Sequence, residues 1–168
     1  RLICIRVSNN IPYETSFMVL SPDGAYVLVN ISSLSAGFDD LIEYGESVGL
    51  SLTLENVCSD AASEISVEIS TDDAYITVTG ASASTSYIAP NGTATVSGLS
   101  FDVAGNIPND YNFELNCAIA SENDMWESTL NFTAHAPVLD VTSVIGDLDP
   151  GQTAEISVDM INNGGTQI

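Results

Sequence analysis

The chain has 168 residues, 45% of them apolar, and a net charge of −21, because 23 acidic residues face only two cationic ones, Arg1 and Arg6. So large an apolar fraction allows a packed core and argues against a disordered chain. So acidic a surface repels phosphate groups, which excludes nucleic acid and anionic membrane surfaces as partners, and no apolar run is long enough for membrane insertion.

Residues 1–22 open in the middle of a strand-like pattern, with apolar residues in Leu2–Ile5. We therefore expect this segment to be the last strands of a preceding module, and the chain to be part of a larger protein.

Apolar and polar residues then alternate with a period of two, which is typical of antiparallel strands with one buried face. The expected inward-facing residues are Val48, Leu50, Leu52 and Leu54, then Ile65, Val67 and Ile69, then Phe113, Leu115, Cys117 and Ile119, then Trp126, Leu130 and Phe132. Turn-forming residues, such as those at 90–92, separate the runs. About seven short strands at this spacing predict an all-β protein with an immunoglobulin-like antiparallel β-sandwich over residues 23–137.

A weak internal repeat follows the sandwich, with Ala136-Pro137 as the junction. Residues 45–56 align with residues 151–162, so that Asn56 matches Asn162, and upstream residues 27–29 align with 138–140. The second copy stops after its second strand. Residues 138–168 are therefore expected to be the first strands of a following repeat, which makes the two ends of the chain partial flanking modules.

Several segments resemble the immunoglobulin-like repeats that lie C-terminal to the catalytic domain of gingipain-type cysteine peptidases and related secreted Bacteroidetes proteins. The matching segments are Tyr44-Gly45-Glu46 with the strand that follows, Asp72 to Val78, Ile88-Ala89-Pro90, and Trp126 to Pro137. The resemblance implies a secreted or cell-surface location. The sequence departs from the family pattern in the loop at residues 35–43. It also departs at Cys58, where the family commonly has Gly and the second copy has Gly164.

Catalysis by this chain is not expected, and we assign it no catalytic residue and no cofactor. A cysteine peptidase needs a thiol beside a histidine, but the only histidine, His135, is predicted at the end of the last strand, whereas Cys117 faces the core. If the parent protein is a peptidase, its catalytic residues lie outside this chain. Cys58 and Cys117 are both expected to face inward, either as a disulfide across the core or as two buried free thiols.

One acidic loop is a candidate for weak calcium binding, through Asp39, Asp40 and Glu43, since carboxylate oxygens are calcium ligands. It lacks the spaced pattern of a dedicated calcium loop, so solvated carboxylates are the simpler interpretation.

The sequence favours a non-catalytic structural module that spaces or stabilises neighbouring domains of the same polypeptide. The alternative is an adhesin module that binds glycan or a host protein through sandwich-end loops, such as 35–46 and 104–111.

Overall fold

The computed structural model describes residues 24–37, 39–146, 150–151 and 153–166; the predicted preceding module at 1–22, with Cys4, lies outside them. The described part contains strands and no helix, as the alternation predicted. The strands are β1 (Val27–Ser35), β2 (Ile42–Glu43), β3 (Ser47–Asn56), β4 (Ala62–Ser70), β5 (Ile76–Gly80), β6 (Ser82–Ile88), β7 (Thr93–Val103), β8 (Tyr111–Ala120), β9 (Met125–His135), β10 (Leu139–Ile145) and β11 (Ser157–Asn162). No helix in the described residues is long and apolar enough to cross a membrane.

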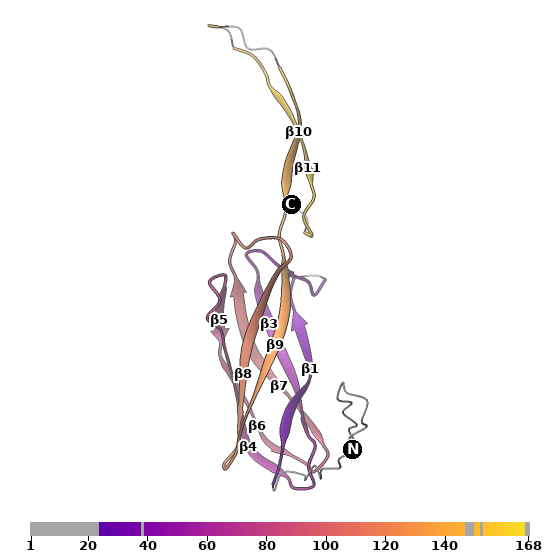
Figure 1. The fold of residues 1–168 in the computed structure, drawn as a ribbon, viewed down its shortest axis with the longest axis vertical. Coiled ribbons are helices and arrows are strands. Elements are labelled where there is room, and N and C mark those ends of the chain that lie inside the picture. The colour runs from indigo at the N-terminus through magenta and orange to yellow at the C-terminus, as the bar shows by residue number, and fades with distance from the viewer. Residues whose placement is uncertain (1–23, 38, 147–149, 152, 167–168) are drawn as a thin grey trace, which may run out of the picture.

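Two sheets face each other in a sandwich, one with strand order β1-β3-β7-β5 and the other with order β2-β9-β8-β4-β6 (Figure 1). All pairs within them are antiparallel except the short β2–β9 pair, which is parallel. The fold is consistent with the immunoglobulin-like sandwich that the sequence predicted. It contains nine strands rather than seven, because β2 has only two residues and the region before β7 forms two short strands.

The core lies between the two sheets and includes the inward-facing residues predicted for β3, β4 and β8, whereas Trp126 and Phe132 of β9 are only partly buried. Val48, Leu50, Leu52 and Leu54 of β3 are at most 1% exposed. Three phenylalanines, Phe101, Phe113 and Phe132, join the sheets through ring-centroid distances of 5.6–6.1 Å. Aromatic rings at such distances add packing energy beyond the area that they bury.

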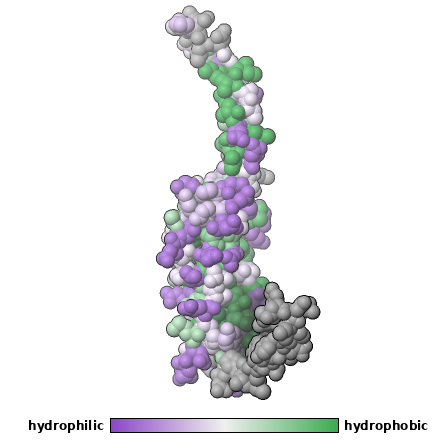
Figure 2. Space-filling model, in the orientation of Figure 1, coloured by the Kyte–Doolittle hydropathy of each residue, from purple (hydrophilic) through white to green (hydrophobic). Residues whose placement is uncertain are grey.

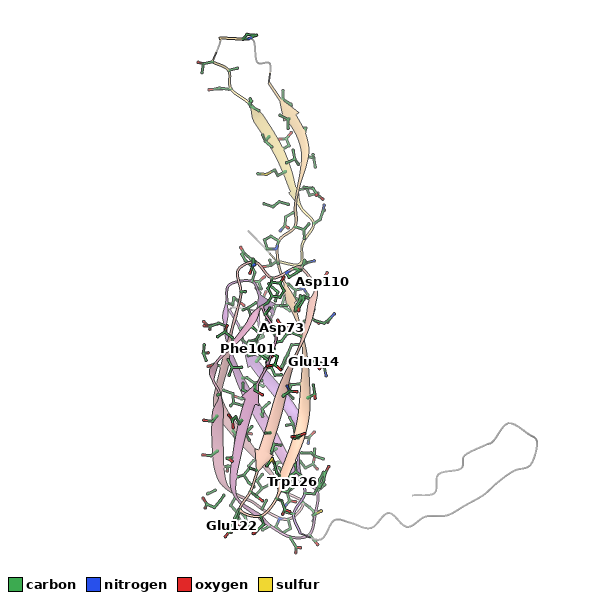
Figure 3. The ribbon with its side chains drawn as sticks, turned by 60° about the vertical axis from the view of Figure 1, so that its left-hand side comes forward. Asp73, Phe101, Asp110, Glu114, Glu122 and Trp126 are labelled. Atoms are coloured by element: carbon green, nitrogen blue, oxygen red, sulfur yellow. The ribbon has the colours of Figure 1, made fainter. Side chains whose placement is uncertain are left out.

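A two-stranded hairpin, β10–β11, projects from one end of the sandwich, directly after β9 (Figure 1). We call this the hairpin end. The opposite end carries the start of β1 and the β8–β9 turn, where Tyr26 and Trp126 stack edge to face at 6.3 Å. Asp110 lies near the hairpin end, and Glu122 and Trp126 lie near the opposite end (Figure 3).

One asparagine fixes the strand pair β1–β3, and a second fixes β10–β11 in the same way. Asn56 Oδ1 accepts hydrogen bonds from the backbone N–H of Tyr26 (3.3 Å) and Cys58 (3.2 Å), and its Nδ2 donates to the carbonyl of Asp60 (2.7 Å). A further Nδ2 contact reaches the carbonyl of Ala89 (3.3 Å). We call this arrangement the asparagine bracket.

Asn162 repeats the bracket at the base of the hairpin. Its Oδ1 accepts from the N–H of Val138 (3.0 Å) and Gly164 (2.9 Å), and its Nδ2 donates to the carbonyl of Thr166 (2.6 Å). Each strand pair also has a bulge at the same place, between Val29 and Ile31 and between Val141 and Ser143.

The bracket corrects the alignment of the upstream segment by one residue. Val27 lies opposite Asn56, and Leu139 lies opposite Asn162, so Val27 corresponds to Leu139 and not to Val138. The error arose because Val138 and Leu139 are both apolar, and a period-two pattern can then be read in either phase.

Candidate functional site

The loops at the hairpin end form the most elaborate polar arrangement in the described part of the chain. The parallel pairing of β2 with the end of β9 sets Glu43 opposite His135. The β7–β8 loop supplies Asn109 and Asp110 at the same end, and His135 Nδ1 lies 2.9 Å from Asp110 Oδ1. The turn after β11 returns to these loops, so three segments distant in sequence meet there.

Two side chains tie the hairpin to the sandwich. Asn109 Oδ1 accepts hydrogen bonds from the N–H of Ala136 (3.1 Å) and of Gly165 (3.0 Å), and so holds both the chain that leaves the sandwich and the chain that returns. Glu43 Oε1 accepts a hydrogen bond from the Thr166 hydroxyl. We call this set of contacts the junction.

Two glycines allow the close approach of backbone at the junction. A Cβ at Gly164 would collide with the carbonyl oxygen of Ala136, and one at Gly165 would lie 2.8 Å from His135 Nδ1 and 3.1 Å from Asn109 Oδ1. Any larger residue would therefore force the turn away from the sandwich. This explains why the second copy has glycine at Gly164, whereas the first copy accommodates Cys58.

An open cleft lies between the acidic loop and the turn after β11. Its lining residues are Gly37, Asp39, Glu43, Glu46, Asn162, Gly164, Gly165 and Thr166. Desolvation raises the pKa of Glu43, the negative charges of Asp39 and Glu46 raise it further, and His135 opposes them. Negative charge is thus concentrated beside the contact that Glu43 makes to Thr166.

The three candidate calcium ligands are only partly brought together. Asp39 and Glu43 line the cleft, but Asp40 does not, and Asp39 Oδ1 already accepts the N–H of Leu41 (3.1 Å). Among the described residues no three acidic, histidine or cysteine side chains are grouped closely enough to hold a metal ion. Calcium binding there remains a prediction from composition.

The thiols and the histidine lie in different parts of the sandwich. Cys117 is opposite Ser128, and His135 follows seven residues later in β9, which at about 3.3 Å per residue is roughly 23 Å along the strand. Burial raises the pKa of Cys117 to about 11, so this thiol is protonated near neutral pH and a poor nucleophile.

Cys58 and Cys117 are free and buried in the structure, the second of the two states that the sequence left open. The alternation predicts that Cys58 lies on the inward face of β3. The strand instead ends at Asn56, whose side chain accepts the Cys58 N–H, so Cys58 is buried in the loop after β3 and is not on the strand face.

The aromatic residues at the hairpin end pack into the fold. Tyr75 and Tyr111 stack edge to face at 5.0 Å, and the Tyr111 hydroxyl donates to Asp73 Oδ2 (2.9 Å), which raises the pKa of Tyr111. Both rings pack against the core. The loops 35–46 and 104–111 thus contribute polar contacts to the junction rather than an aromatic platform.

Sequence analysis missed Asn109 and Thr166 and gave Asn56 and Asn162 no role. A signal was nevertheless present. Both bracket asparagines follow three apolar residues at alternate positions and occupy an inward-facing place, where an unpaired amide would be costly.

No protein-family model matches the chain, and no curated protein matches it either.

Proposed function

We propose that this chain is a non-catalytic structural module of a larger secreted or cell-surface bacterial protein, in which it spaces and stabilises neighbouring domains. The resemblance of its sequence to gingipain-type repeats suggests a cysteine peptidase as the parent, with the catalytic residues outside this chain.

The junction is the observation that carries the proposal. Asn109 holds both chain segments that connect the sandwich to the hairpin, and Glu43 binds Thr166. A flexible linker between modules needs no such contacts, whereas a spacer that sets a fixed direction does.

Binding of glycan or a host protein through loops 35–46 and 104–111 is less favoured. Side chains of both loops are engaged in the junction, and a ligand there would compete with the turn after β11.

The test is the distribution of distances between the hairpin and the sandwich. Spin labels on Val144→Cys and Glu68→Cys, in a Cys4→Ser background, report this distance by electron-electron double resonance. Cys58 and Cys117 are buried and stay unlabelled. We expect a narrow distribution that broadens when Asn109→Ala removes its two hydrogen bonds.

Asn112→Ala is the matched control. Asn112 lies three residues after Asn109, at the start of β8, but its side chain accepts the Thr133 hydroxyl within the β8–β9 pair (2.8 Å) and does not contact the hairpin. It should leave the distribution narrow. A distribution that is already broad before Asn109 is changed would overturn the proposal.

A further inference from the structure

The hairpin β10–β11 has the geometry of β1–β3 but lacks the covering that β1–β3 has. Both pairs share the asparagine bracket and the bulge. Each also has a backbone hydrogen bond from the residue after the asparagine, Val57 N–H to Tyr26 (3.0 Å) and Asn163 N–H to Val138 (2.7 Å). Residues of β11 can therefore be matched one by one to those of β3.

The matched residues differ sharply in exposure. Leu50, Leu52 and Leu54 of β3 are at most 1% exposed, whereas their equivalents Ile156, Val158 and Met160 are 48%, 45% and 60% exposed. Val27 is 1% exposed and its equivalent Leu139 is 49% exposed. Figure 2 shows the resulting concentration of apolar surface along the hairpin.

Acidic residues of the hairpin lie on its other face. Asp159 corresponds to Thr53 and Asp140 to Leu28, both of which point away from the core in the first pair. The face equivalent to the core face of β3 therefore carries apolar side chains and no described acidic residue, which suits a protein core and not a cation or a sugar.

The open edge of β11 corresponds to an edge of β3 that is paired with another strand. β3 pairs with β1 on one side and with β7 on the other, while β11 pairs, within the described residues, with β10 alone. An isolated hairpin is at best marginally stable in water, and an open edge is a template for another strand.

We propose that β11 pairs in cis with a strand of the β7 kind, supplied by the second sandwich that the hairpin opens. This deepens the proposed function, on which it rests. The register of β3 with β7 sets the register expected here: Ile156 opposite the position of Leu99, Val158 opposite Val96, and Met160 opposite Ala94.

A second copy of this chain is a poorer occupant of the same edge. Two β11 strands pairing with each other would bring Asp159 of one molecule near its counterpart, and each molecule carries a net charge of −21. Like charges across a strand pair are destabilising.

The test extends the full chain after Ile168 with a short Gly/Ser linker and a second copy of the sequence Thr93–Val103. The new strand would start near the base of the hairpin and run antiparallel to β11, as β7 does to β3. One cysteine is placed by Val158→Cys and another at the Val96 position of the appended strand, in a Cys4→Ser background. The out-of-register control moves the second cysteine to the Phe101 position.

We expect the in-register pair to oxidise about tenfold faster than the control, since the two tether lengths differ by only about five residues, which keeps the effective concentrations similar and leaves pairing as the main difference. Amide exchange supplies a second measurement: the β11 N–H groups that point away from β10 should gain protection. Equal oxidation rates with no new protection would overturn the proposal.

Val158→Cys in the chain without the extension tests the other occupant. A disulfide-linked dimer that forms readily and increases with protein concentration would show that a second copy covers the edge, and would also overturn the proposal. The spin-label distances between hairpin and sandwich do not depend on the edge, so the proposed function can survive this failure.

Discussion

At the scale of single residues, the two bracket asparagines make equivalent hydrogen bonds in different surroundings. Asn56 is fully buried, and its amide pairs with the buried N–H of Cys58 and with two partly buried backbone groups, of Tyr26 and Asp60. Asn162 is partly exposed and binds the equivalent backbone groups, those of Val138, Gly164 and Thr166. The same substitution, asparagine to alanine, can thus be compared at a buried and at a partly exposed position.

Asn56→Ala should lower the free energy of unfolding of the sandwich by about 2–4 kcal/mol, because it leaves the buried Cys58 N–H and several partly buried backbone groups without partners. Asn162→Ala should leave the unfolding of the sandwich unchanged and remove only the exchange protection of the Val138 and Gly164 amides. Denaturant unfolding and hydrogen exchange measure the two effects. An equal loss of sandwich stability in both variants would contradict this account.

Glu43 gives the junction a dependence on pH. Its pKa is raised in the folded chain, chiefly by desolvation and then by Asp39 and Glu46, with His135 acting in the opposite sense. A raised pKa means that the folded state binds the proton more tightly, so this contribution to stability is fully present below the unfolded pKa and is lost as the pH rises through the folded pKa.

Exchange protection of the Gly165 amide should therefore increase as the pH is lowered through the pKa of Glu43, after correction for intrinsic exchange rates. Glu43→Gln removes the charge but keeps an oxygen acceptor for Thr166, and should make the protection independent of pH. A pH dependence that persists in Glu43→Gln would assign the effect to another group, such as His135 or Asp110.

At the scale of elements, the sequence predicted the long strands and the turn at 90–92, but not the short strand β2. In β3, β4 and β8, apolar and polar residues alternate over nine or ten residues. Over that length only one of the two strand faces is consistently apolar, so the buried face can be predicted. β2 has two residues and no pattern of its own, yet its pairing with β9 positions Glu43 at the junction. Asn109 and Thr166 are brought together with their partners by tertiary folding, which leaves no local signal.

The described residues of the hairpin contribute no side chain to the apolar core of the sandwich. Removal of residues 138–168 should therefore change the melting temperature of the sandwich by only a few degrees, the loss being that of the exposed junction hydrogen bonds. Differential scanning calorimetry of the chain with and without these residues measures the change. A loss of cooperative unfolding would show instead that the hairpin is part of the folding unit.

At the scale of the whole molecule, the distribution of charge has a consequence for proteolysis. The only arginines are Arg1 and Arg6, and the sequence contains no lysine. Trypsin-like enzymes require a cationic side chain before the scissile bond. The chain after Arg6 should therefore resist them even when it is unfolded.

Mass spectrometry after trypsin digestion in moderate urea should show residues 7–168 as one piece. A glutamate-specific peptidase, used as the control under the same conditions, should cut the chain into many fragments because it has numerous acidic residues. Internal cuts by trypsin would contradict the expectation.

The parallel pairing of β2 with β9 also affects how the sandwich would respond to a mechanical load. β1 begins at the end opposite the hairpin and β9 leaves at the hairpin end (Figure 1). A pull along the long axis therefore drags β9 past β2, and the load is shared by the hydrogen bonds of that pair at once instead of breaking them in succession. Only Ile42 and Glu43 face β9 in this pairing, whereas β8 pairs with β9 over ten residues, so the short pair beside the junction would be the first to yield when the molecule is stretched.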